Sequence, residues 1–169
     1  MPNWIKGTFR ARGEKENIKR FIMEGLTPVD LGGNEQNISR EIDDEDDYFH
    51  ITFKLESENT KDKYPDYLHI AGTRRQFLEY LCLGEINVYK NKNGDYQFAQ
   101  SFKGAWGIDT DHIEEIAKKY EIDIRVNGFE CGMEFEQLFE VSRNGQIKCN
   151  SVISYDDYTW QCSMPLLGG

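Results

Sequence analysis

The sequence predicts an α+β fold in which helices cover one face of an antiparallel sheet. Several short segments alternate apolar and polar residues, two intervening segments carry apolar residues at helical spacing, and two Asn-Gly pairs separate alternating segments. A ferredoxin-like split β-α-β arrangement is the most economical fold for this order. We therefore expect one ferredoxin-like domain over residues 1–169, with an insertion at about 56–90, a C-terminal hairpin and a tail at 155–169.

The opening residues predict a half-buried strand over 4–12, followed by a helix over 15–24. Ile5, Phe9 and Ala11 share one face of the strand, which is therefore expected to meet the core. The opposite face is expected to carry Trp4, Lys6, Thr8, Arg10 and Arg12.

The segment 27–47 is expected to be an extended, solvated loop. Six of the seven residues 41–47 are acidic, and their mutual repulsion favours exposure to solvent. A regular strand is expected to follow over 48–55, with Phe49 and Ile51 among its inward residues.

A short strand at 67–71 is expected next, followed by a short helix over 73–82. Thr73 and Gln76 fit a capping box, in which the two side chains satisfy free backbone donors at a helix start. The remaining expected elements are strands over 85–90 and 96–102 around Asn93-Gly94, a helix capped by Asp109 that reaches Tyr120, a strand over 122–126, and a hairpin of 133–141 and 146–153.

Composition and charge exclude several classes of protein. Ten Phe, nine Tyr and three Trp argue against global disorder. A net charge of −10, from 30 acidic and 20 basic residues, argues against attraction of the whole chain to nucleic-acid backbones or anionic lipid. The sequence shows no signal peptide and no apolar run of the ~18 residues that a membrane span needs, so we expect a cytoplasmic protein with no membrane partner.

No catalytic or metal-binding motif is found. The cysteines at 82, 131, 149 and 162 make no C-x-x-C pair, and the sequence contains no H-E-x-x-H, no nucleophile elbow and no P-loop. We therefore predict no catalytic residues, no metal ligands, no cofactor and no enzymatic activity. A site assembled only in space, such as a Cys–His pair, stays open as an alternative.

Two blocks of residues resemble a known family. The chain opens with Met1-Pro-Asn-Trp4, an alternating strand, Gly13 and a helix. The second block runs from Ser101-Phe-Lys-Gly-Ala-Trp106 through a helix and the strand 122–126 to Cys131-Gly-Met-Glu-Phe135. This order resembles the YubB-type ferredoxin-like proteins of phages, plasmids and other mobile elements.

The resemblance covers about half of the chain and leaves residues 27–71 unmatched. Glu134 stands where the family pattern leads us to expect a small residue. The resemblance implies a ferredoxin-like fold and a mobile-element origin. The expected location of the protein is therefore the cytoplasm of the host cell. It implies no catalytic residues.

Clustered acids predict a surface that docks on a basic protein. Carboxylates spaced along a strand can mimic a nucleic-acid backbone and occupy a basic cleft. Glu134, Glu136 and Glu140 share strand parity, so we expect them on one face. The alternatives are a solvated loop, an ordinary wet sheet face, and a Trp160 that packs on its own core. The candidate partner-binding residues are Asp43, Asp44, Asp46, Asp47, Glu134, Glu136, Asp156, Asp157 and Trp160.

The first strand supports a different interpretation. Residues 1–20 carry a net charge of +4, which leaves −14 for residues 21–169. An exposed Trp4 with interleaved cations on an open sheet is how RNA-recognition domains stack and neutralise bases, although the RNP1 pattern is absent. Alternatively, these cations pair with local acids.

These observations predict a protein that acts by binding. The favoured hypothesis is an acidic anti-defence inhibitor of the anti-CRISPR type, a DNA mimic that occupies a basic cleft of a host nucleic-acid-processing effector. The alternative hypothesis is a small RNA- or single-strand-binding module that uses the first strand, with nucleic acid the less favoured partner.

Overall fold

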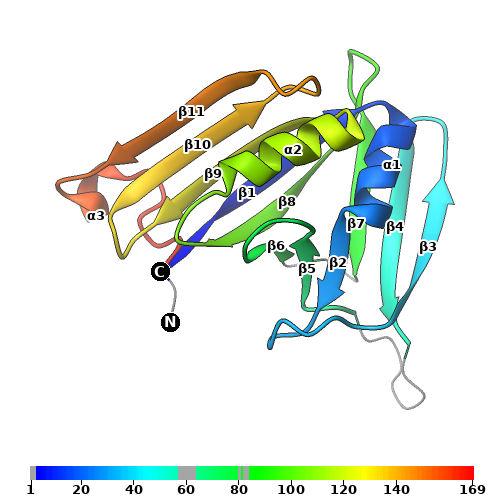
Figure 1. Cartoon of the computed structure of the whole chain (residues 1–169), viewed down its shortest axis with the longest axis horizontal. Helices are drawn as coiled ribbons and strands as arrows, with labels where there is room; N and C mark the ends of the chain where they lie inside the picture. Colours follow the sequence, from blue (N-terminus) through cyan, green and yellow to red (C-terminus); the bar gives the residue numbers. More distant parts are fainter. Residues whose placement is uncertain (1–2, 57–63, 80, 82–83) are drawn as a thin grey trace.

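The computed structural model describes residues 3–56, 64–79, 81 and 84–169. Within these residues, eleven strands form one antiparallel sheet (Figure 1). Its central strand β1 (Trp4–Gly13) pairs with β8 (Tyr96–Ala105) on one side and with β9 (Asp123–Glu130) on the other. The predicted α+β class is confirmed. The sheet is larger than that of a simple ferredoxin-like fold.

Beyond β9, the sheet continues into the predicted C-terminal hairpin. The hairpin consists of β10 (Phe135–Val141) and β11 (Ile147–Ser154). Its turn closes where Gly145 N–H donates to the Ser142 carbonyl at 2.7 Å, and Gly145 has a φ of 81°, which favours glycine. The short helix α3 (Tyr158–Gln161) follows.

On the other side of β1 the sheet forks at β8, and the C-terminal half of β8 pairs with β6. The predicted helix over 73–82 is wrong: among its described residues, 76–79 form β6, which pairs with residues 101–104 of β8. This pairing provides hydrogen-bond partners for the backbone of 76–79 and buries Leu78 completely. Tertiary packing therefore overrides the local capping signal. This branch consists of β6 (Gln76–Glu79), β5 (Tyr67–Ile70) and β2 (Leu26–Val29).

The N-terminal half of β8 pairs with a second branch. The prediction of a loop over 27–47 is wrong in part, because β2 begins at 26 and β3 occupies 38–44. Residues 41–47 are exposed as expected, yet the backbone of β3 bonds to β4 over its whole length. This branch consists of β7 (Glu85–Lys90), β4 (Tyr48–Leu55) and β3 (Ile38–Asp44).

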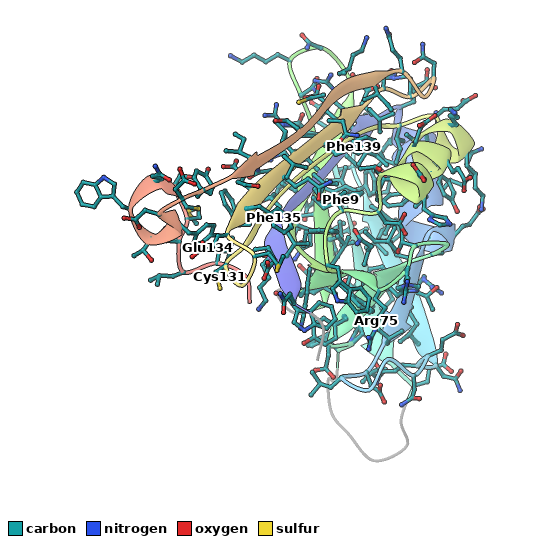
Figure 2. The ribbon with its side chains drawn as sticks, turned by 60° about the vertical axis from the view of Figure 1, so that its left-hand side comes forward. Phe9, Arg75, Cys131, Glu134, Phe135 and Phe139 are labelled. Carbon is teal, nitrogen blue, oxygen red and sulfur yellow. The ribbon has the colours of Figure 1, made fainter. Side chains whose placement is uncertain are left out.

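Helices α1 (Lys15–Glu24) and α2 (Thr110–Tyr120) lie on the same face of the sheet (Figure 1). Between them and the strands, the ring of Phe9 stacks against Phe21 of α1 and Phe98 of β8, with centroids 5.9 and 6.1 Å apart. Phe9 and Phe139, labelled in Figure 2, are completely buried in this core. The same core includes side chains from both branches of the fork.

The two predicted faces of the first strand are confirmed. Ile5, Phe9 and Ala11 are buried against the helices. The opposite side of the sheet, here called the polar face, is the one to which β1 contributes Trp4, Lys6, Thr8, Arg10 and Arg12.

The tail packs on one end of the polar face. Tyr158 and Cys162 form a small buried cluster with Phe129, which pairs in register with Lys6. The Gly169 N–H donates to the Trp4 carbonyl at 2.8 Å. The tail therefore packs on β9 through Tyr158 and Cys162 and reaches the first strand at Gly169.

The chain order places α2 between β8 and β9, the two strands that flank β1. This is a split β-α-β unit. The predicted insertion at 56–90 contributes β5, β6 and β7 to the same sheet, while 57–63, 80, Cys82 and 83 lie outside the described residues. None of the helices in the described chain has the length and apolarity needed to cross a membrane.

Candidate functional site

The candidate acids fall into two separate groups, and the first lies at the β3–β4 turn. Asp43, Asp44, Asp46 and Asp47 are all exposed there. Hydrogen bonds from Lys15 and from Lys19 to the Asp44 carboxylate hold its pKa below the usual value. Lys90 Nζ lies 2.9 Å from Asp47, so half of these acids already have a cationic partner.

The second group lies around α3 and the β9–β10 turn. Glu136 accepts hydrogen bonds from Asn127 at 3.0 Å and from the Tyr155 hydroxyl at 2.8 Å. Asp157 caps α3 by accepting from the Trp160 N–H at 3.2 Å. Asp156 is exposed beside it, and the Trp160 side chain is 85% exposed.

The prediction that Glu134, Glu136 and Glu140 share one face is wrong for Glu134. This residue precedes β10 and has a φ of 57°, so it does not continue the alternation of the strand. In the same turn, the carboxylate of the buried Glu130 accepts hydrogen bonds from the backbone N–H groups of Gly132 and Met133. Figure 2 shows Glu134 and Cys131 at this turn.

The structure does not bring the nine candidate residues together. Figure 1 places the β3–β4 turn and α3 at opposite ends of the longest axis of the molecule. The acids therefore form two separate surfaces, and only the β3–β4 turn has four of them within five consecutive positions.

A more concentrated set of side chains lies on the polar face at the start of β1. Rings from three strands line a cavity of about 470 Å³ there. The Phe77 ring of β6 has its centroid 6.3 Å from that of Trp4 and 5.9 Å from that of Tyr67. The ring centroid of His69, on β5, lies 5.3 Å from that of Phe77. We call this the Trp4 pocket; Trp4, Tyr67, His69 and Phe77 are each half-buried.

Two cations complete the Trp4 pocket. Lys103 Nζ lies 4.3 Å from the Trp4 ring centroid and 5.2 Å from that of Tyr67. The Arg75 guanidinium lies 5.9 Å from the Trp4 ring. Burial lowers the pKa of Lys103 from its ordinary value, against the opposing charge of Glu79. The pocket therefore combines flat aromatic surfaces with two cations, while Asp30 and Glu35 also line it.

Strand register explains why these residues meet. Lys6, Lys103, Phe77 and His69 pair successively across β1, β8, β6 and β5, forming one row on the polar face. The loop that follows β2 supplies the remaining wall, including the 76% exposed Leu31.

Sequence reasoning identified Trp4 and Lys6 but missed Phe77 and Lys103. Phe77 was assigned to a helix, and Lys103 was not singled out in the returning strand. The alternation of buried and half-buried residues in 67–70 and 76–79 is the signal that could have placed Phe77 on a strand. Two predicted cations of β1 do pair with acids, since Lys6 lies 3.6 Å from Glu79 and Arg12 lies 3.0 Å from Asp123.

No cluster of three His, Cys, Asp or Glu side chains suited to a metal ion occurs within the described residues. A scan of the chain against protein-family models found no match, and comparison with curated proteins and with solved structures found no significant one. The resemblance to YubB-type proteins therefore stays a prediction.

Proposed function

We propose that this protein binds single-stranded nucleic acid on its polar face, with a base held in the Trp4 pocket. The observation that carries the proposal is the gathering of Trp4, Tyr67 and Phe77 around one cavity, with the ammonium of Lys103 beside the Trp4 and Tyr67 rings. Every base has a π-face, and stacking on an aromatic side chain contributes ~1–3 kcal/mol per base.

The charge of the molecule favours a single strand over a duplex. A net charge of −10 repels a long phosphate backbone. Lys103 and Arg75 place two cations directly beside the rings, with the acids Asp30 and Glu35 on the loop that follows β2. Lys103 has a flexible four-carbon stem, so it can move from the ring to a neighbouring phosphate when a base enters. Unstacked bases of single strands are the usual ligands of aromatic sheet surfaces.

The proposal includes a finer statement about the fold. The strand order β9-β1-β8-β7, with α1 and α2 on the opposite face, is the order of a ferredoxin-like core. In this view β2 to β6 are additions to that core, and two of them, β5 and β6, build the Trp4 pocket.

Fluorescence anisotropy with a labelled octanucleotide, as RNA and as DNA of the same sequence, tests the proposal. We expect Trp4→Ala and Phe77→Ala to weaken binding about 5- to 150-fold, the range expected for one lost stacking contact. Trp4→Phe keeps a ring and should recover part of the affinity. Lys103→Met should weaken binding, whereas the matched control Lys92→Met, at the exposed β7–β8 turn, should not.

Two results would overturn this function. One is the absence of wild-type binding to either oligonucleotide at low salt. The other is equal affinity of the wild type and all three Trp4 pocket variants, Trp4→Ala, Phe77→Ala and Lys103→Met.

We also propose, as a second candidate function, that the β3–β4 turn docks on a basic cleft of a host nucleic-acid-processing effector. The supporting observation is that residues 41–47 are exposed and lie at one extremity of the molecule. In this proposal the protein is an acidic anti-defence inhibitor, and Glu134, Glu136, Asp156 and Asp157 take no part in the same contact.

Co-elution with candidate effectors at rising salt tests this second proposal. The wild type should form a salt-sensitive complex, and the combined variant Asp43→Asn, Asp46→Asn, Asp47→Asn should lose it. A complex that survives these substitutions unchanged, or no complex with any effector, would contradict the proposal.

A further inference from the structure

A second cavity, of about 630 Å³, lies further along β1 on the same polar face. Arg10 and Arg12 of β1 line it, together with Arg125 of β9. We call it the Arg10 cavity. Its other lining residues include Asn87 and Tyr89 of β7 and Ala99 of β8. Three acids, Glu85, Asp123 and Glu140, also line it.

Strand register explains the hollow. Arg10 pairs with Ala99 on one side and with Arg125 on the other. The single methyl group of Ala99 leaves space beside the long Arg10 side chain. The fork of the sheet at β8 brings β7 to the edge of this space, so the cavity has a wall as well as a floor.

The three arginines differ in their partners. Arg12 lies 3.0 Å from Asp123, and Arg125 lies 3.3 Å from Glu140. Arg10 is exposed and forms no ion pair among the residues that the structure describes. Arg10 and Arg125 also pair directly across β1 and β9, where Glu140 offsets the charge of Arg125 and leaves Arg10 as the arginine without a carboxylate partner among the described residues.

We propose that the Arg10 cavity binds a phosphate of the same strand whose base occupies the Trp4 pocket. This inference rests on the proposed nucleic-acid function. It specifies the path of the bound strand, which runs along β1 from the Trp4 pocket to the Arg10 cavity. Arg10 follows Trp4 by six positions on β1, which spans ~20 Å at the usual rise of a strand. At the ~3.4 Å axial spacing of stacked nucleotides, about six nucleotides cover that length, and an extended strand needs fewer.

The path predicts that the effect of Arg10 depends on ligand length. A dinucleotide is too short to reach both cavities, so it should occupy the Trp4 pocket alone. A decanucleotide reaches both, and its affinity should include the Arg10 contact. Removing one contact between a cationic side chain and a phosphate reduces the slope of log affinity against log salt by about one.

NMR titration with a dinucleotide and anisotropy with a decanucleotide test the path. Arg10→Ala should weaken decanucleotide binding about 5- to 10-fold and reduce its salt slope by about one, with dinucleotide affinity unchanged. Trp4→Ala should weaken both ligands. The matched control Arg20→Ala removes an exposed arginine from α1, on the opposite side of the sheet, and should change neither.

The outcomes separate the two proposals. Binding that depends on Trp4 but not on Arg10, or that responds to Arg10→Ala equally at both lengths, would overturn the path and leave the Trp4 pocket intact. A wild type that binds neither ligand would overturn both proposals.

Discussion

The ammonium of Lys103 lies over the indole ring of Trp4, with Nζ 4.3 Å from the ring centroid. The two residues belong to β8 and β1, and they occupy neighbouring rows of the sheet because Lys103 pairs in register with Lys6. This contact holds a cation and an aromatic surface together before any ligand arrives. A pre-formed arrangement of this kind reduces the entropic cost of binding.

Lys103→Met is predicted to separate binding from stability. The substitution removes a cation–π contact of about 0.5–1 kcal/mol, and it also relieves the burial of a charge. We therefore expect the free energy of unfolding to change by less than about 1 kcal/mol while oligonucleotide affinity falls. Urea unfolding and anisotropy of the same preparations measure the two effects, and a large loss of stability would contradict this assignment.

The pH dependence of Lys103 has a definite sign. Because folding lowers its pKa, its charged form is less favourable in the folded state, and this penalty disappears as the pH rises through the lowered pKa toward the ordinary value. The wild type should therefore gain stability relative to Lys103→Met on going from neutral to alkaline pH, while its advantage in oligonucleotide affinity declines. Parallel profiles of the two proteins would contradict the prediction.

Arg143→Ala is predicted to destabilise the fold in a pH-dependent way. Arg143 donates to both Asp95 oxygens at 3.2 Å and to Asp123 at 3.1 and 3.3 Å, so it ties the β10–β11 turn to the β7–β8 turn. Charge-assisted hydrogen bonds of this kind lead us to expect a loss of about 1–2 kcal/mol at neutral pH.

The loss should shrink in acid. Burial acts to raise the pKa of Asp123, but hydrogen bonds from Arg143 and Arg12 outweigh it and hold the pKa below the usual value. The stabilisation is therefore complete above the unfolded value of about 4 and is lost as the pH falls through the lowered pKa. Urea unfolding at neutral and acid pH checks this, and an equal difference at both would show that Asp123 is not involved.

Two phenylalanines on opposite faces of the sheet should behave differently. Phe9 is completely buried, so Phe9→Ala should cost about 3–5 kcal/mol of stability and leave the affinity of the folded fraction unchanged. Phe77 is half-buried in the Trp4 pocket, so Phe77→Ala should cost less stability but weaken oligonucleotide binding. Thermal unfolding and anisotropy distinguish the two, and the same pattern for both variants would contradict the placement of the site.

Patterns within single elements were predictable from the sequence. The two faces of β1, the helix that ends at Tyr120 and the two Asn-Gly hairpins depend on periodicity and turn chemistry, which are local. The strand β6 was missed because four residues are too few to establish a period, and Thr73 imitated a helix cap. Its hydroxyl instead donates to the Ile70 carbonyl at 2.5 Å.

The candidate site was less accessible to sequence reasoning, because it depends on strand pairing. Phe77 and Lys103 are brought together only by the β6–β8 ladder, which no local pattern encodes. Counting charges along the sequence was enough to find the acidic run at 41–47. Such counts could not show that the β3–β4 turn and α3 would lie at opposite ends of the molecule, since that separation depends on the order of strands in the sheet.

The most direct test of the account is an NMR titration of the isotope-labelled protein with a single-stranded octanucleotide. Binding in the Trp4 pocket should produce the largest chemical-shift changes at the Trp4 indole and at the amides of Tyr67, Phe77 and Lys103, with little change in α1 and α2. Shifts confined to the helices or to the β3–β4 turn, or no shifts at all, would contradict it.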